Sequence, residues 1–180
     1  SQYKKLRLED LIEVEVTTAS RRAEPIGRSA SAVQVITRDD IRRSGATSIP
    51  EALRLAPNLQ VAQVNASQWA ISARGFNNVL ANKLLVLIDG RSVYGPLFSG
   101  VFWDVQDVLL EDVERIEVVS GPGGTLWGAN AVNGVINIIT RSSADTHGSY
   151  VEAGAGSELR SFASGRFGGA LSPDLHYRVY

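Results

Sequence analysis

Two strand-like runs joined by a glycine-rich connection occupy residues 113–141 and constrain the fold more than any other feature. In Val113–Ser120, apolar side chains alternate with Arg115 and Glu117, which is the two-residue period of a strand with one buried face. The second run, Gly134–Arg141, is apolar on both faces and is typical of an interior strand. The connection is too long for a tight hairpin, and its glycines permit the positive φ angles of a compact loop. The stretch therefore predicts two core strands joined by a looped-out excursion.

The glycine-rich connection matches neither of the common phosphate-binding patterns. A P-loop needs G-x-x-x-x-G-K-[ST], and this connection has neither the lysine nor the following hydroxyl residue. The dinucleotide pattern G-x-G-x-x-G begins at Gly121 and Gly123 but meets Leu126 at its third glycine position. A helix long enough to present its N-terminus to a phosphate is not predicted after the loop. The pattern therefore disfavours a nucleotide-binding site.

The residues that carry catalysis or metal binding are sparse in this sequence. The chain has no cysteine, and its histidines, His147 and His176, have no partner at metal-ligand spacing. A G-x-S-x-G nucleophile elbow is also absent. An acidic cluster lacks the calcium-loop pattern and predicts a solvated charged face; it consists of Asp104, Asp107, Glu111, Asp112, Glu114 and Glu117. We therefore expect no enzyme activity, no catalytic residue, no cofactor and no metal site.

Length and charge limit the class of protein further. A chain of 180 residues can bury roughly two-thirds of its unfolded surface in one core. A net charge of −1, without a basic stripe, disfavours nucleic acid as a partner. Because the sequence lacks methionine, we expect a processed or excised fragment, and a removed signal peptide is one explanation. The longest purely apolar run, Leu84–Ile88, is too short for a membrane-spanning helix.

The N-terminal region contains a candidate strand followed by a candidate linker. In Leu11–Ala19, Val14 and Val16 alternate with polar side chains, so the segment can form a strand with one apolar face. The alternation alone favours an edge strand of the domain. The alternative is a detachable strand that adds to the sheet of a partner. Residues 20–31 have the composition of a linker.

Two short helices and several strands are predicted between this linker and the glycine-rich stretch. Thr37 begins the first helix at capping-box spacing, and Gly45 ends it. The second helix begins at Thr47 or Ser48, carries an apolar face for core packing, and is ended by Pro57. The strands precede and follow these helices at Ala32–Ile36, Leu59–Val64, Ala70–Arg74 and Leu84–Ile88.

The last of these strands leads into a long loop, Arg91–Asp104, which contains four large aromatic residues. Large aromatics in a loop either pin it to the core or offer a contact surface.

After Arg141 the composition shifts toward glycine, serine and alanine. Gly148–Tyr180 shows weak alternation over strands of about ten residues with short turns, which is the sequence form of transmembrane barrel strands. A soluble β-meander is the alternative. Because an unclosed strand pair is marginal in stability, we expect this segment to be disordered or paired with another copy.

Five segments, in this order and at plausible spacing, resemble the plug domain of TonB-dependent outer-membrane receptors. They are EVEVTTAS (Glu13–Ser20), VQVITRDDIRRSGATSIPEALRLAPNLQV (Val33–Val61), ISARGF (Ile71–Phe76), LLVLIDGRSVY (Leu84–Tyr94) and VERIEVVSGPGGTLWGANAVNGVINIIT (Val113–Thr140). The resemblance extends from about Leu11 to Arg141, and five ordered segments are far more specific than a single motif.

The resemblance implies an α+β fold, with a small mixed β-sheet of about four strands and short helices, followed by truncated antiparallel β-barrel strands. Residues 1–31 would be a mobile N-terminal segment with a TonB-box-like strand and linker. Residues 32–142 would be the plug domain, and residues 143–180 the first strands of the barrel. In such receptors a barrel of about 22 strands surrounds the plug.

The resemblance also implies a function. The chain would be the plug or gate of a receptor in the outer membrane of a Gram-negative bacterium, with its N-terminus in the periplasm. Its partners would be TonB, its own C-terminal barrel, the outer membrane and a small-molecule metal chelate or cobalamin-like ligand, of the ferric siderophore, haem or cobalamin class. The alternative is a non-transporting periplasmic binding module that docks through its N-terminal strand.

The TonB-binding segment identified by the resemblance consists of Glu13, Val14, Glu15, Val16, Thr17, Thr18 and Ala19. The resemblance therefore favours the detachable strand over an edge strand of the domain. A TonB-binding strand adds to the sheet of its partner through main-chain hydrogen bonds. Main-chain pairing can transmit a pulling force without strict side-chain specificity. Residues 20–31 would then be the tether that transmits this force.

Further site residues are implied by the same resemblance. Arg74 and Arg115 match two family arginines that form a plug–barrel latch with barrel glutamates. In a chain without its barrel, both are expected to be solvated or locally paired. Substrate contact is expected at Trp69, Arg91 and Tyr94, which combine aromatic surface with a cation. Trp127 is expected in core or barrel-facing packing.

Overall fold

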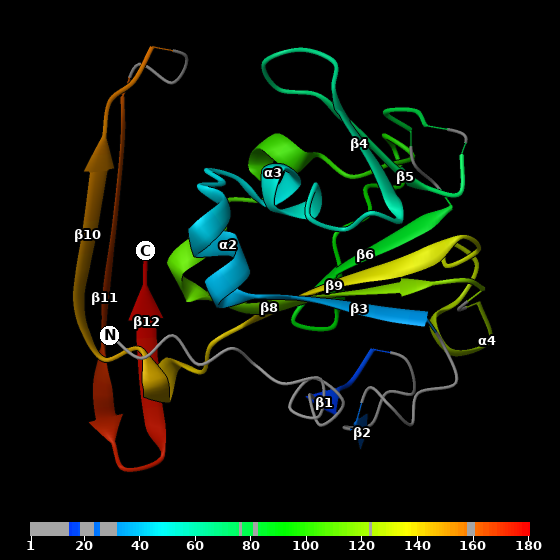
Figure 1. The fold of residues 1–180 in the computed structure, drawn as a ribbon. Coiled ribbons are helices and arrows are strands. Elements are labelled where there is room, and N and C mark those ends of the chain that lie inside the picture. Colours follow the sequence, from blue (N-terminus) through cyan, green and yellow to red (C-terminus); the bar gives the residue numbers. More distant parts are fainter. Residues whose placement is uncertain are drawn as a thin grey trace.

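The computed structural model describes residues 15–18, 24–25, 32–75, 77–80, 83–122, 124–157 and 161–180 (Figure 1). The described strands form a central five-stranded sheet, a β4–β5 hairpin, a C-terminal three-stranded sheet and a short β1–β2 pair. Within these residues, we find no helix that combines the length and apolar character needed to cross a membrane.

The strands are β1 (Glu15–Val16), β2 (Glu24–Pro25), β3 (Ala32–Thr37), β4 (Leu59–Gln63), β5 (Trp69–Ala73), β6 (Leu84–Ile88), β7 (Arg91–Ser92), β8 (Val113–Ser120), β9 (Gly134–Thr140), β10 (Gly148–Gly154), β11 (Phe162–Ser172) and β12 (Leu175–Val179). The helices are α2 (Arg38–Ser44), α3 (Ile49–Leu53), α4 (Gly124–Trp127) and the 3₁₀ helices η2 (Trp103–Val105), η3 (Leu110–Asp112) and η4 (Ser143–Asp145).

The central sheet has the strand order β3-β8-β9-β6-β7 and is mixed, because β6 and β9 are parallel while β8 is antiparallel to both of its neighbours. The predicted α+β fold with a mixed sheet and short helices is confirmed, and the two-residue β7 adds a short fifth strand. The two runs of residues 113–141 are adjacent antiparallel strands, and the loop between them contains the one-turn helix α4.

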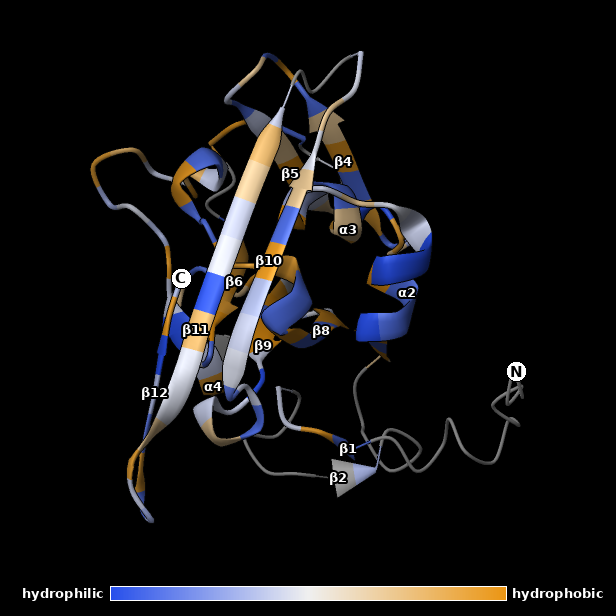
Figure 2. Ribbon diagram, turned by 90° about the vertical axis from the view of Figure 1, so that its left-hand side faces the viewer, coloured by the Kyte–Doolittle hydropathy of each residue, from blue (hydrophilic) through white to orange (hydrophobic). Residues whose placement is uncertain are grey.

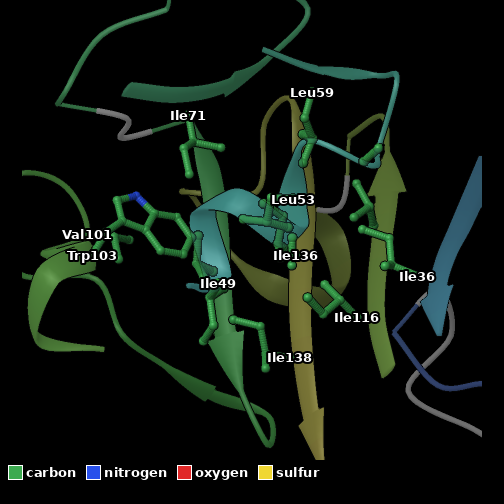
Figure 3. Close-up of a cluster of buried hydrophobic side chains, with 14 of the residues drawn as sticks. Ile36, Ile49, Leu53, Leu59, Ile71, Val101, Trp103, Ile116, Ile136 and Ile138 are labelled. Atoms are coloured by element: carbon green, nitrogen blue, oxygen red, sulfur yellow. The ribbon is translucent and has the colours of Figure 1, made fainter. Parts of the chain in front are cut away.

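One face of the central sheet packs beneath α3 to form the main core (Figure 3). Ile116, Ile136 and Ile138 point toward Ile49 and Leu53 of the helix, and all five are almost completely buried. Burying a side chain of this kind contributes about 1.5–3 kcal/mol. The apolar face that the sequence predicts for this helix is therefore the face that covers the sheet.

The ends of the helices follow the predicted capping chemistry. Thr37 and Asp40 form a reciprocal capping box at the start of α2, and Gly45 ends the helix with a left-handed φ of 70°. At the start of α3, Glu51 accepts hydrogen bonds from the backbone and side chain of Thr47, at 2.7 and 2.8 Å. Ser48 is the N-cap of α3 but makes no capping hydrogen bond with its side chain, so Glu51 binds the residue before the cap.

Gly134 is a position where the central sheet admits only a hydrogen atom. A Cβ there would lie 2.5 Å from the backbone oxygen of Val119 on the neighbouring strand. We expect Gly134→Ala to force β8 and β9 apart and to lower the free energy of unfolding by about 1–3 kcal/mol. Urea unfolding measures the change. Gly165→Ala is the control, because its nearest neighbour would be at 3.7 Å; equal stability of the two variants would contradict the expectation.

The C-terminal sheet has the order β10-β11-β12, and its two faces differ in character. Tyr150, Arg166 and Arg178 share the face toward the rest of the chain, as their register through Gly168 requires. The opposite face is mostly apolar and exposed, and includes Val151, Phe167 and Val179. In Figure 2, blue hydrophilic segments interrupt β10 and β11, which are otherwise white to orange. The alternation is that of barrel strands, with polar residues inside and apolar residues outside.

The expectation that Gly148–Tyr180 is disordered or paired with another copy is wrong for its described residues. Three strands pair within the one chain, and Arg166 and Arg178 form ion pairs with the buried Asp112. These contacts supply the support that an isolated strand pair lacks.

Candidate functional site

The second face of the central sheet, opposite the helices, combines an apolar cluster with two buried polar side chains. Glu117 on β8 lies directly across from Asn137 on β9. Apolar residues of the same sheet and of the loop between β8 and β9 form a second cluster on this face, made of Leu85, Leu87, Val119, Ala131 and Val135 with Val33 and Trp127 at its margin. Both polar residues are buried, with exposed fractions of 0% for Glu117 and 6% for Asn137.

The Glu117 carboxylate binds the backbone of the N-terminal strand. Thr17 donates its N–H to both carboxylate oxygens, at 3.2 and 3.0 Å, and Thr18 donates its N–H to Oε2 at 2.8 Å. These residues lie about a hundred positions away in the sequence. Hydrogen bonds to a charged group are among the stronger ones in proteins, at about 1.5–3 kcal/mol each.

Arg115 neutralises the same carboxylate. Its Nε donates to Glu117 Oε1 at 2.8 Å, and its Nη1 lies 3.2 Å from the more exposed Glu114. A carboxylate buried in an apolar surrounding requires such compensation, because an isolated buried charge is strongly destabilising. Glu117 is therefore satisfied only while Arg115 and the N-terminal backbone supply its donors together.

Asn137 and Trp127 bind the next residue of the strand. Asn137 donates from Nδ2 to Thr18 Oγ1 at 3.2 Å, and Trp127 donates from Nε1 to the Thr18 carbonyl at 2.9 Å. The Oδ1 of Asn137 accepts the Gly90 N–H at 3.3 Å, which fixes the amide orientation. Thr18 is 1% exposed as a result.

The described part of the predicted TonB-binding segment, residues 15–18, is thus docked on the sheet. Val16 is fully buried, and β1 pairs with Glu24 and Pro25 of β2. The mobile character expected for residues 1–31 stays a prediction. Glu13, Val14 and Ala19 lie outside the described residues.

The predicted solvated acidic face is wrong at two positions. Glu117 and Asp112 are 0% and 1% exposed. The alternation of β8 places Glu117 opposite the main core, but the returning N-terminal strand covers that second face. Asp112 is covered by arginines of the C-terminal sheet.

The two predicted latch arginines differ in their surroundings. Arg74 follows β5, is exposed, and has a left-handed φ of 59°. Arg115 is paired locally with Glu117 and Glu114. Exposure and local pairing were the expected states without a surrounding barrel, and the latch role itself stays a prediction.

The predicted substrate-contact residues are not brought together. Trp69 is 8% exposed and belongs to the main core, with the Arg54 guanidinium 5.4 Å from its ring centre. It lines a cavity of about 140 Å³ with Phe98, Phe102 and Trp103 of the long loop. Of these loop residues, Trp103 is buried in the main core and pins the loop, whereas Phe102 is exposed. Arg91 is exposed on β7, and Tyr94 is half-buried.

The two histidines contact one another through their rings, with Nε2 of His147 2.8 Å from Nδ1 of His176. Within the part of the chain that the structure describes, His, Cys, Asp and Glu do not gather in a group of three that could bind a metal.

The sequence did not reveal that Glu117, Asn137 and Trp127 bind the N-terminal strand. A signal for Asn137 was present, because a single amide interrupts the otherwise apolar run of β9. Buried polar groups inside a sheet require partners, so this amide indicated a contact above that face. The partner itself could not be identified from a period-2 pattern.

Comparisons with known proteins identify the family of the chain. A family model described as "TonB-dependent Receptor Plug Domain" matches residues 25–135, which is more than half of the chain. The vitamin B12 transporter BtuB of Vibrio vulnificus (strain CMCP6) is 35% identical over 151 residues, covering 83% of this chain and 24% of the relative. The BtuB of Vibrio cholerae serotype O1 (strain ATCC 39541) is 34% identical over 145 residues, covering 81% and 23%. The chain therefore spans about a quarter of the length of these curated relatives.

Solved structures show the same fold. The ferripyoverdine receptor of the outer membrane of Pseudomonas aeruginosa has a TM-score of 0.71 and 24% identity, covering 92% of this chain and 21% of the receptor. The ferric-catecholate import receptor Fiu of E. coli K12 has a TM-score of 0.61 and 26% identity, covering 83% and 20%. This chain belongs to the TonB-dependent receptor plug domain family, and its location is the outer membrane of a Gram-negative bacterium.

Proposed function

We propose that this chain is the plug and coupling segment of a receptor that takes up a scarce nutrient of the ferric siderophore, haem or cobalamin class. The observation that carries the proposal is the docked N-terminal strand, whose backbone donors at Thr17 and Thr18 are held by Glu117. In this account TonB engages residues 13–19 from the periplasm and pulls on them.

The chemistry of the docked strand suits transfer to a partner. Glu117 binds the N–H groups of Thr17 and Thr18 through one carboxylate, and β2 pairs with only the two residues of β1. A sheet edge on a partner would offer hydrogen bonds along the whole strand, each contributing about 0.5–1.5 kcal/mol net. The partner can therefore compete for the strand without recognising its side chains.

The nutrient class rests on what relatives and neighbours are named for: a vitamin B12 transporter, a ferripyoverdine receptor and a ferric-catecholate import receptor. Trp69, Arg91 and Tyr94 remain proposed contacts for such a ligand. Arg74 and Arg115 remain the proposed latch to barrel glutamates. In the latched state, Arg115 would divide its donors between Glu117 and the barrel.

Uptake by the whole receptor tests the proposal. Deleting residues 13–19 is expected to abolish growth on a limiting iron or cobalamin source, while ligand binding at the cell surface persists. Deleting residues 1–7, a polar lead of the same length, is the control and is expected to leave growth unchanged. Growth that survives deletion of residues 13–19 would contradict the proposal. A receptor that binds TonB but supports no uptake of any tested nutrient would favour the non-transporting binding module.

A further inference from the structure

A second buried carboxylate, Asp112, lies where the central sheet meets the C-terminal sheet. Its backbone oxygen accepts the Arg141 N–H at 2.8 Å, so it also closes the end of β9. Its side chain is 1% exposed and forms an ion pair with Arg166 of β11. Oδ2 lies 3.6 Å from Nε of Arg178 on β12.

The two arginines are aimed at this carboxylate by the register of their strands. Arg166 and Arg178 lie on the inner face of the C-terminal sheet, and their side chains are only 8% and 15% exposed. Arg178 also donates to the Arg141 carbonyl at 2.9 Å and to Thr140 Oγ1 at 3.1 Å. Two of the three strands, β11 and β12, are therefore tied to the plug at one place, where Asp112 meets the end of β9.

Away from Asp112, the C-terminal sheet stands off from the plug. A cavity of about 700 Å³ separates α2 and the segment before β8 from the sheet, and Arg42, Glu111, Tyr150 and Glu152 are among its lining residues. Near Asp112 the two are joined by buried ion pairs, which attach the sheet to the residue that precedes β8.

The surroundings of Asp112 contain several more arginines. Arg38 forms an ion pair with Glu111, the residue that precedes Asp112. Burial lowers the pKa of the Arg38 guanidinium, and the nearby charges of Arg141 and Arg42 lower it further. Cations thus converge on Asp112 from both the plug and the C-terminal sheet. Removing the Asp112 charge would leave Arg166 and Arg178 buried without their counter-ion, which is the costly case for a buried pair.

We propose that Asp112 is a fixed electrostatic anchor that attaches the plug to the first strands of its barrel wall. The charges are arranged in the opposite way to those of the proposed Arg74 and Arg115 latch. In the anchor the acid is in the plug and the arginines are in the barrel wall, whereas in the latch the arginines are in the plug. The attachment does not depend on TonB or on any nutrient, so it goes beyond the proposed function.

The position of the anchor has a mechanical consequence, which does rest on the proposed function. Asp112 directly precedes β8, and Glu117 on β8 holds the N-terminal strand. A pulling force on the N-terminal strand would therefore act first on β8. The start of β8 is attached to the barrel wall through Asp112.

The anchor can be tested by distance measurements on the full chain. The sequence has no cysteine, so spin labels can be placed through Arg43→Cys on α2 and Val151→Cys on β10, both at exposed positions. We expect one narrow distance distribution for the otherwise unchanged chain. In Asp112→Asn, the detached population should rise roughly 100-fold and broaden the distribution. Asp107→Asn, at an exposed acid of the same segment, should not change it.

A second variant keeps the test informative if Asp112→Asn fails to fold. Arg166→Gln lies in the C-terminal sheet and should broaden the distribution in the same way, while the unfolding temperature of the plug is unchanged. A distribution in both variants that matches Asp107→Asn would overturn the proposal. Broadening in Asp112→Asn alone would also overturn it, because Asp112 would then act inside the plug.

Discussion

Replacing Glu117 by glutamine is expected to release the N-terminal strand from the plug. The carboxylate accepts hydrogen bonds from the backbone of Thr17 and Thr18 and forms an ion pair with Arg115. Glutamine lacks the negative charge on which these contacts depend. Losing it should favour the undocked strand by about 3 kcal/mol, which is roughly a 100-fold change in population. Hydrogen exchange at the Thr17 and Thr18 amides measures the release directly.

Glu114→Gln is the matched control for this prediction. Glu114 also contacts Arg115, at 3.2 Å, but its side chain is 53% exposed and it does not touch the strand in any contact that the described residues show. Exchange at Thr17 and Thr18 should stay slow in this variant. If Glu117→Gln exchanges at the same rate as Glu114→Gln, the strand is held by other contacts and Glu117 has no docking role.

Replacing Thr17 by proline is expected to weaken TonB binding, although it also frees the strand from Glu117. Proline removes the N–H that the docked strand donates at 3.0 Å and that a partner's sheet would use in the same way. The partner's carbonyl is then left without its donor, which costs about 1–3 kcal/mol, or roughly 5- to 150-fold in Kd. Because undocking alone would strengthen binding, weaker binding identifies main-chain pairing as the mode of recognition.

Thr17→Ala separates the side chain from the main chain at the same position. Alanine keeps the N–H and removes only the hydroxyl, whose contact with Glu117 is long at 3.5 Å. Its Kd should stay within roughly threefold of the unchanged chain. If alanine weakens TonB binding as much as proline does, the partner reads the threonine side chain and the strand-addition account is wrong.

Much of the fold was accessible from local patterns in the sequence. The capping chemistry of Thr37 and Gly45 predicted α2, and the apolar run Leu84–Ile88 predicted β6 with the bounds that the structure has. The glycine-rich excursion between β8 and β9 was also predicted. These features are determined by residues a few positions apart, so period and propensity suffice to find them.

Only part of the candidate site could be predicted from the sequence, because its two parts lie about a hundred residues apart. The alternation at Glu117 correctly placed it opposite the main core. It could not show that Thr17 and Thr18 return to cover that face, which turns a surface acid into a buried one. Asp112 was misassigned for the same reason, since Arg166 and Arg178 reach it from another sheet. Trp69 reads as a surface aromatic in its loop context, yet the hairpin turns it into the core.

The central claim is that residues 13–19 are the segment that TonB binds. Titrating the periplasmic domain of TonB against the full chain, and against the chain lacking residues 13–19, tests it most directly. We expect saturable binding to the full chain and loss of binding after the deletion. An unchanged Kd in the deleted chain would contradict the claim, because TonB would then bind the plug elsewhere.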